Sequence, residues 1–290
     1  MKKGVLYALG AYITWGLFPV YWKFLKDVPA LQLLGHRIIW SFLFLFIFIL
    51  AARQFKHFRA AIASKRVLLI YLTAAILIGI NWCIYVWAVN AGFIVETSLG
   101  YFINPLFSVL LGVIILKERL RKFQWIPIVI ATSGVTLLSL EYGRLPWIAL
   151  SLAFTFAIYG LIKKTAPLNA VNGLLLETGI LFLPALAFLA VSQFSGQGAF
   201  LHLGAGSDLL MIGAGAVTTI PLLFFASAAQ RIPLSLLGTI QYIAPSLQFL
   251  LGVFVFREPF NQTQLIGFCI VWLALVLFWG ESLWFHRKQA

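Results

Sequence analysis

Ten runs of about 20 mainly apolar residues, separated by short polar connections, fill this chain of 290 residues. A helix needs about 20 apolar residues to cross the hydrocarbon core of a bilayer, so each run predicts a membrane-spanning helix. The runs leave no room for a soluble domain, and we predict an all-α polytopic membrane protein with ten transmembrane helices. They cover residues 4–23, 34–52, 67–90, 95–116, 123–140, 145–163, 170–191, 209–230, 233–256 and 262–284.

The composition agrees with lipid as the main solvent of the chain. Hydrophobic residues make up 62% of it and charged residues only 10%, whereas soluble domains carry about 25% charged residues. The formal net charge is +13, but Lys and Arg fall between the apolar runs, where they can contact anionic lipid headgroups. We therefore expect membrane lipids and no nucleic acid among the partners, and nothing in the sequence selects an oligomeric state.

The placement of Lys and Arg predicts how the chain crosses the membrane. With the N-terminus in the cytoplasm, 16 of the 21 Lys and Arg residues fall on cytoplasmic segments, four fall outside, and Arg37 lies in the second run. Cytoplasmic connections of membrane proteins carry such an excess of positive charge. We predict a multi-pass protein of the bacterial inner membrane, with both termini in the cytoplasm and residues 192–208 outside.

Two stretches, starting at Ile103 and Ile243, are related without a gap. Nine of 24 positions are identical at an offset of 140 residues. Each copy belongs to a set of five runs, and an odd number inverts the second set in the membrane. We predict two inverted five-helix repeats, 1–142 and 143–290, an arrangement typical of secondary transporters. The identities that apolar bias does not supply are Pro105/Pro245, Gly112/Gly252, Glu118/Glu258 and Gln124/Gln264.

Enzyme signatures are missing from the sequence. It contains no HExxH, GxSxG or P-loop motif, and no GxGxxG motif after a strand. Cys83 and Cys269 stand alone in apolar runs, where we expect small buried side chains. We therefore predict no enzyme activity, no cofactor and no metal site.

Polar and proline residues recur on one side of the fourth and ninth runs. The spacing i, i+4, i+7, i+11 places residues on one helical face. Each proline removes a backbone hydrogen bond, so we expect Pro105 and Pro245 to bend their helices. The two faces either line a cavity or hold helices together through polar contacts. They consist of Tyr101, Pro105, Ser108 and Gly112, and of Gln241, Pro245, Gln248 and Gly252.

Aromatic and amide side chains extend this candidate cavity. Asn81 and Tyr85 form a polar i, i+4 pair in the third run, and Trp15 lies deep in the first run. We expect Trp22, near the end of the first run, to belong to the aromatic belt that faces lipid. The candidate substrate-cavity residues are Trp15, His36, Arg37, Asn81, Tyr85, Tyr101, Asn104, Gln241 and Tyr242.

Ionisable residues at membrane depth are costly, which makes each of them a candidate for function. Arg37, together with His36, provides either a cationic site for a carboxylated or amphipathic substrate or an ion pair with Glu96. Glu177 either couples transport to protons or pairs with the lysines at 163–164. Glu177 and Glu96 are therefore the candidates for coupling.

Two further acids stand at the ends of the fourth and ninth runs. Glu118 follows Lys117 directly, and Glu258 follows Arg257. We expect both carboxylates to form solvated pairs with these neighbours.

Five motifs, in order along almost the whole chain, resemble the RarD-type branch of the EamA family in the drug/metabolite transporter superfamily. The resemblance implies ten helices around a central cavity and the export of small molecules. It selects no substrate. The motifs are TWGLFPVYWK (14–23), LLGHRIIWS (33–41), INWCIYVWAVN (80–90), ETSLGYFINPL (96–106) and QYIAPSLQFLLGV (241–253).

Together these features predict a secondary transporter that exports small metabolites or drugs by alternating access. A facilitative exchanger or uniporter and a channel remain alternatives within transport. An intramembrane enzyme is the alternative from another class, and it would need a nucleophile–base pair or a metal cluster at membrane depth.

Overall fold

The computed structural model describes residues 2–91, 93–141, 145–257 and 262–289. Over these ranges the chain consists of helices joined by turns and short connections, and it has no strand. In the described part, nine helices are long and apolar enough to cross a membrane, and α12 adds a shorter apolar stretch, Leu265–Phe278. The predicted class, an all-α polytopic membrane protein, is confirmed.

Every predicted run coincides with a helix. The first five are α1 (Lys2–Lys23), α2 (Ala30–Ala51), α4 (Lys65–Asn90), α5 (Ile94–Ile114) and α6 (Trp125–Glu141), the last preceded by the 3₁₀ turn η1 (Lys122–Gln124). The next three are α7 (Trp147–Thr165), α8 (Ala170–Phe194) and α9 (Ala205–Ala229). The ninth run forms α10 (Leu234–Gln241), α11 (Ile243–Leu250) and the π-helical η2 (Leu251–Phe256), and the tenth is α12 (Gln262–Gln289).

A short helix, α3 (Phe55–Ile62), lies between α2 and α4 and is absent from our sequence predictions. Phe58 on one side is buried against Leu45 and Ile49 of α2, while Lys56 and Arg59 on the other side are exposed. With an apolar side and a basic side, α3 has the pattern of a helix that lies in the membrane interface. The search for runs of spanning length could not detect it, because it has only eight residues.

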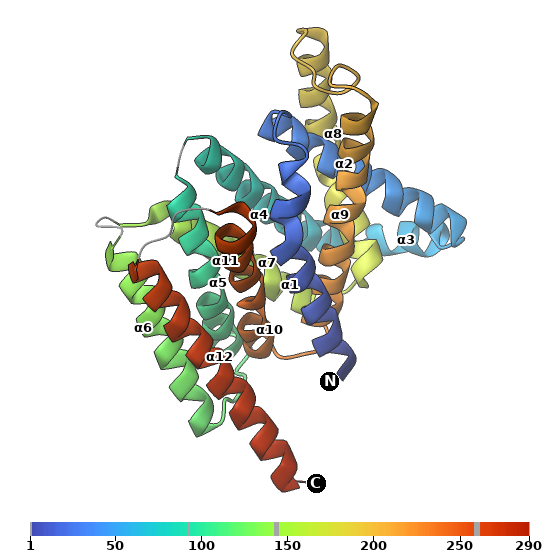
Figure 1. The fold of residues 1–290 in the computed structure, drawn as a ribbon. Helices are drawn as coiled ribbons and strands as arrows, with labels where there is room; N and C mark the ends of the chain where they lie inside the picture. The colour runs from blue at the N-terminus through green and yellow to red at the C-terminus, as the bar shows by residue number, and fades with distance from the viewer. Residues whose placement is uncertain (1, 92, 142–144, 258–261, 290) are drawn as a thin grey trace.

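Both chain termini lie at one end of the helix bundle, which we call the terminal end. In Figure 1 the labels N and C stand at the lower side of the molecule, and the connection from α8 to α9 stands at the top. We call the end with the α8–α9 connection the far end. Under the predicted topology the terminal end faces the cytoplasm and the far end faces outside.

The helices of the two halves pack in matching ways. α1 packs on α9 and α11, while α7 packs on α4 and α5. α2 packs on α8, and α6 packs on α12, as Figure 1 shows at the lower left. Small residues permit the last contact, because a Cβ added to Gly134 would lie 2.9 Å from Cγ2 of Ile270. All of these contacts join a helix of residues 1–142 to a helix of residues 143–290.

Pro105 and Pro245, which match between the two related stretches, lie in differently shaped helices. α10 ends at Gln241, and α11 begins at Ile243, so the ninth crossing is interrupted just before Pro245. Helix α5, in contrast, continues through Pro105. Each proline lacks the N–H that would bind the carbonyl four residues earlier, which belongs to Gln241 or Tyr101. Both helices therefore lack one backbone hydrogen bond at the proline, but of the two only the ninth crossing is interrupted there.

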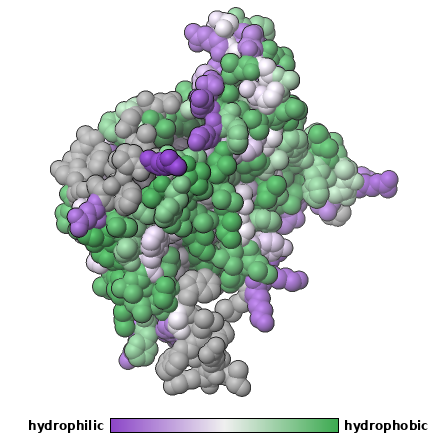
Figure 2. All heavy atoms as spheres, in the orientation of Figure 1, coloured by the Kyte–Doolittle hydropathy of each residue, from purple (hydrophilic) through white to green (hydrophobic). Residues whose placement is uncertain are grey.

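The outer surface of the bundle is apolar along the middle of the helices. Figure 2 shows a largely hydrophobic surface on this face, with hydrophilic residues mainly at the top, towards the left-hand and right-hand edges and near the bottom. Leu183 is 70% exposed and Val129 is 64% exposed, which is consistent with a surface that faces lipid. Our prediction that Cys83 and Cys269 are buried is wrong, because both are exposed. An apolar run does not reveal which of its sides faces the bundle.

Candidate functional site

A cavity of about 160 Å³ lies inside the bundle and is lined by residues from both predicted repeats. The lining residues come from α1, α2, α4, α5, α7, α9, α10 and α11. Of the predicted residues, the structure brings together at this cavity Trp15, Arg37, Asn81, Tyr85, Tyr101, Asn104, Gln241 and Pro245.

The cavity extends from the middle of the bundle towards the far end. On α5 its lining runs from Thr97 to Asn104, which is the half of that helix nearest the far end. On α4 it includes Asn81 and Tyr85, again in the half that ends there. The terminal half is filled instead by a buried cluster that contains Phe225, Leu237 and Ile240, among others.

Arg37 places a positive charge on the cavity wall. It lies seven residues after Ala30, the first residue of α2, which is about 10 Å along a helix. Its Nε donates a hydrogen bond of 2.9 Å to the Thr218 hydroxyl. The guanidinium carbon lies 5.1 Å from the ring centroid of Trp22 and 5.1 Å from that of Trp82. The charge is thus held by one hydrogen bond and two aromatic faces.

Aromatic rings form much of the remaining wall. Tyr85 and Tyr101 meet with their centroids 5.9 Å apart at an angle of 66°. Trp15 contacts Phe156 edge-on at 5.8 Å. Trp22 also lines the cavity, so our expectation that it faces lipid is wrong. Rings with polar tips on apolar walls are typical of sites for small amphipathic molecules.

Some amide side chains at the cavity join helices, as the second of our two sequence interpretations proposes. The Asn81 amide nitrogen donates to the Leu152 carbonyl at 2.8 Å and to the Thr155 hydroxyl at 2.9 Å, which ties α4 to α7. The Gln248 amide nitrogen donates to the Trp15 carbonyl at 3.1 Å. These polar groups hold the wall in shape.

Two other polar groups at the cavity make no such contact. The Tyr12 hydroxyl is buried and has no hydrogen-bond partner among the described residues. Gln241, which is 6% exposed, likewise makes no side-chain hydrogen bond within the described part of the chain. A buried polar group without a partner is costly, and a ligand that supplies one is stabilised by it.

Two predicted cavity residues point elsewhere. His36 is buried against Phe200, with ring centroids 5.0 Å apart, and does not line the cavity. Tyr242 is buried in a cluster with Phe102 and Val271. Each is the neighbour of a lining residue, and one residue turns a helix by about 100°, which rotates the neighbour away from the cavity.

The two candidate coupling acids do not line the cavity either. Glu96 accepts a hydrogen bond of 2.7 Å from the Ile148 N–H, in the first turn of α7. The ion pairs between described residues do not include one from Arg37 to Glu96, which was our alternative for Arg37. A carboxylate is favourable at this position because the helix N-terminus carries partial positive charge.

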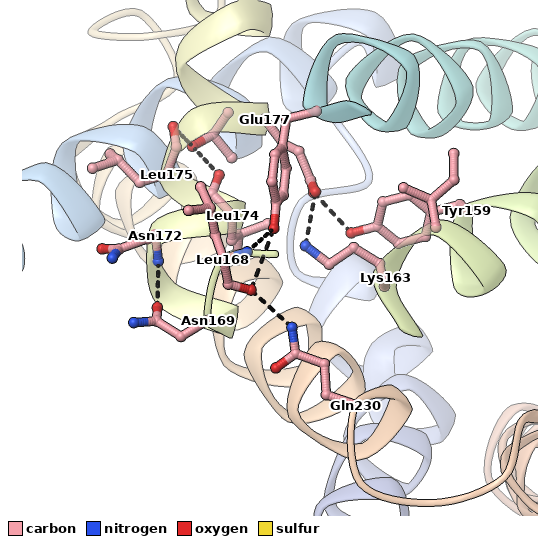
Figure 3. Close-up of polar contacts among 12 residues, drawn as sticks. Tyr159, Lys163, Leu168, Asn169, Asn172, Leu174, Leu175, Glu177 and Gln230 are labelled. Carbon is pink, nitrogen blue, oxygen red and sulfur yellow. Dashed lines mark hydrogen bonds and ion pairs between the residues drawn. The ribbon is translucent and has the colours of Figure 1, made fainter. Parts of the chain in front are cut away.

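Glu177 forms a buried ion pair with Lys163, which Figure 3 shows. The Lys163 ammonium lies 2.7 Å from one carboxylate oxygen, and the Tyr159 hydroxyl donates to the other at 2.9 Å. Both charged side chains are only 1% exposed. The structure therefore matches the pairing alternative for Glu177. Lys164 instead donates to the carbonyl of Ile232 at 2.7 Å.

Glu118 is a functional candidate that the sequence did not reveal. Its carboxylate accepts hydrogen bonds from the backbone N–H of Leu234 at 2.6 Å and of Ser235 at 2.9 Å. The Ser235 hydroxyl adds a third bond of 2.6 Å. Our expectation of a solvated pair with Lys117 is wrong, because Glu118 caps the N-terminus of α10. We call these three bonds the Glu118 cap; Glu258, its counterpart in the repeat, lies outside the described residues.

The Glu118 cap joins the two predicted repeats at the terminal end. A Cβ added to Gly112 would lie 2.7 Å from the Glu118 carboxylate and 3.1 Å from the Ser235 nitrogen, so α5 approaches α10 closely there. A Cβ added to Gly238 would lie 2.8 Å from the Pro105 carbonyl oxygen. Glycine at both positions lets the helices close below the cavity.

Comparisons with known proteins identify the family. The model of the EamA-like transporter family matches residues 2–140. An uncharacterized transporter of Bacillus subtilis, YojE, is 47% identical to this chain, and the match covers 96% of this chain and 93% of the length of YojE. Protein RarD of Streptomyces exfoliatus is 45% identical over 99% of this chain and 91% of its own.

The chain is a RarD-type member of the EamA-like transporter family. Protein RarD of Escherichia coli, 41% identical over 100% of this chain and 98% of its own, supports the same assignment. One solved structure shares the fold of this RarD-type chain, with a TM-score of 0.69 and 19% identity over 96% of this chain and 97% of the other. The family assignment makes the chain a multi-pass membrane transporter.

Proposed function

We propose that this RarD-type chain is a secondary transporter of the inner membrane that exports small metabolites or drugs by alternating access. The observation that carries the proposal is the cavity lined by residues of both predicted repeats, 1–142 and 143–290, with a buried cluster filling the bundle on its terminal side. Alternating access needs a site that two related halves can expose to either side in turn.

The terminal end holds the contacts that such a transporter must break to open inwards. The Glu118 cap links the end of α5 to the start of α10. Below the cavity, Leu237 and Ile240 are buried in the terminal-half cluster. With the termini in the cytoplasm, this arrangement corresponds to a state that is closed towards the cytoplasm.

The two coupling candidates, Glu177 and Glu96, have different surroundings in the structure. Protonation of Glu177 would require its buried pair with Lys163 to separate or hydrate, and both side chains are only 1% exposed. Glu96 accepts a hydrogen bond from the Ile148 N–H and directly precedes Thr97, a residue of the cavity wall. We propose that any proton coupling uses Glu96 before Glu177, and that the Glu177 pair stabilises the fold.

The proposal is tested with purified protein in liposomes. A thermal stability screen against a metabolite library first supplies a ligand, because a compound that binds only the folded state raises the melting temperature. Uptake of that ligand, labelled, is then followed in liposomes loaded with unlabelled ligand. Saturable uptake that accelerates with internal ligand is expected of a carrier.

Each alternative gives a different result in that assay. A channel gives flux that is neither saturable nor accelerated by internal ligand. An exchanger or uniporter gives accelerated exchange but no accumulation when a proton gradient is imposed, whereas a coupled exporter accumulates ligand on one side. Turnover of the ligand into another compound would point to an enzyme. The result expected of a channel, of an exchanger or uniporter, or of an enzyme would overturn coupled export.

A further inference from the structure

Arg37 is the single charged side chain on the cavity wall in the described part of the chain. No Asp, Glu or Lys of the described residues accompanies it there. The lining consists otherwise of aromatic, aliphatic and uncharged polar residues. A cavity of this composition offers an attractive partner to one negative charge and none to a positive charge, apart from the aromatic rings.

Most hydrogen-bonding capacity of Arg37 is unused. A guanidinium has five N–H donors, and within the described residues only the Nε–H is bonded, to Thr218. The four donors on the two Nη atoms remain for another partner. Because that bond and the faces of Trp22 and Trp82 hold the group in place, its donors are already oriented when a ligand arrives.

The uncharged part of the wall is suited to an apolar body with a small polar tip. Trp15 and Phe156 contribute rings to the wall, and the Tyr12 hydroxyl is a buried polar group without a partner. Gln241 adds an amide that makes no other hydrogen bond among described residues. A ligand held at Arg37 would share the cavity with these aromatic rings and with the Tyr12 hydroxyl.

We propose that the cavity binds an amphipathic monoanion, a carboxylate on an aryl or alkyl body, with the carboxylate held by the Nη donors of Arg37. A guanidinium binds a carboxylate through two parallel hydrogen bonds. A phosphate monoester carries about −1.5 to −2 charge at neutral pH, which one arginine does not balance. An ammonium ligand finds no carboxylate on the described wall. This proposal rests on the proposed function, since it treats the cavity as the substrate site.

The test uses three probes with one skeleton: 3-phenylpropionate, 3-phenylpropionamide and 3-phenylpropylamine. They differ only in a negative, neutral or positive head group. Binding to the purified full chain in detergent is followed by quenching of tryptophan fluorescence, because three tryptophans line the cavity: Trp15, Trp22 and Trp82. We expect the carboxylate to bind at least about tenfold more tightly than the amide and the amine, the difference that a charge-assisted hydrogen bond provides.

Variants assign the preference to Arg37. Arg37→Gln is expected to remove the preference for the carboxylate, and Arg37→Lys to retain only part of it, because Lys lacks the paired donors. Arg231→Gln is the matched control. Arg231 also contacts an aromatic ring, Tyr7 at 5.3 Å, and a hydrogen-bond acceptor, the Ser227 carbonyl, but it is exposed and remote from the cavity. This control is expected to bind all three probes as the natural chain does.

Several outcomes overturn the proposal. They are equal binding of the three probes, preference for the amine, a carboxylate preference that survives in Arg37→Gln, and no carboxylate binding up to about 10 mM. If Arg37→Gln does not fold, the partial preference of Arg37→Lys decides in its place. Binding is measured in a separate assay from transport. A carboxylate that binds but is never carried across the liposome membrane therefore refutes only the proposed transport function. Saturable transport of ligands without anion preference refutes the anion site alone.

Discussion

The Glu118 cap leads to a quantitative prediction about the conformational equilibrium. Three donors bind this carboxylate at 2.6–2.9 Å, and they can do so only while α5 and α10 are together at the terminal end. Hydrogen bonds to a charged group contribute about 1.5–3 kcal/mol each, and a carboxylate at a helix N-terminus adds about 0.3–1 kcal/mol. Glu118→Gln keeps one acceptor oxygen but removes the charge.

The expected loss for Glu118→Gln lies at the low end of these values, because Glu118 is half-buried and water hydrates it when the cap opens. We expect Glu118→Gln to destabilise the closed arrangement by about 1.5 kcal/mol. This loss raises the population that is open at the terminal end about tenfold. Glu118→Ala removes all three bonds, and at about 1.5 kcal/mol for each the expected loss of about 4.5 kcal/mol corresponds to a change of roughly a thousandfold.

A cysteine at Leu237 reports this population. Leu237 is 2% exposed in the closed state and lies in the buried cluster below the cavity. The measured quantity is the rate at which an impermeant thiol reagent labels Leu237→Cys from the terminal side, with Cys83 and Cys269 replaced because both are exposed. Where opening is fast relative to labelling, the rate follows the open population, so Glu118→Gln should label about tenfold faster.

The control is Glu281→Gln. Glu281 also accepts a hydrogen bond of 2.6 Å, from Arg121, but this bond joins η1 to α12 and leaves α10 untouched. Its labelling rate should equal that of the natural chain. Unchanged labelling in both Glu118 variants, or the same increase in Glu281→Gln, would refute the role of the cap in closing the terminal end.

Three further predictions concern stability and topology. Lys163→Met or Glu177→Gln alone should lower the free energy of unfolding by about 3–5 kcal/mol, because each leaves a buried charge or donor without its partner. The double variant Lys163→Met with Glu177→Leu should restore most of this loss. Thermal unfolding in detergent measures the single and double variants, and additive losses would contradict the pairing. Asn81→Ala should cost about 1–3 kcal/mol by the same measurement, because it removes two bonds between α4 and α7. In intact cells an impermeant reagent should label a cysteine at Gln197 and not one at Leu120, and the reverse pattern would refute the topology.

The crossings of the membrane could be predicted because they depend on local sequence and solvent. A run of about 20 apolar residues has one stable form in lipid, a helix, since only a helix bonds all its own backbone groups. The same reasoning missed α3, which has only eight residues and is too short to span the membrane. It also missed the interruption between Gln241 and Ile243, because proline predicts a lost hydrogen bond and leaves the shape of the bend open.

The cavity could be predicted only in part. Helical period placed Tyr101 and Gln241 on polar sides of their helices, and both line the cavity. The helical period does not determine how each helix is rotated relative to its neighbours. His36 and Tyr242 were therefore counted among the cavity residues, although both side chains are turned away from the cavity. Trp22 was assigned to lipid by its position near a helix end, yet it contacts Arg37.

The sequence by itself determined the solvent of this protein, its ten crossings and, through the 16-to-4 distribution of Lys and Arg, a predicted direction of insertion. These follow from composition and from spacing along a single helix. Only the tertiary structure decided which charge meets which partner: Arg37 with Thr218, Glu177 with Lys163, and Glu118 with the start of α10. Glu118 and Leu234 are separated by 116 residues, and electrostatic pairing over such a span depends on helix packing, which no local pattern specifies.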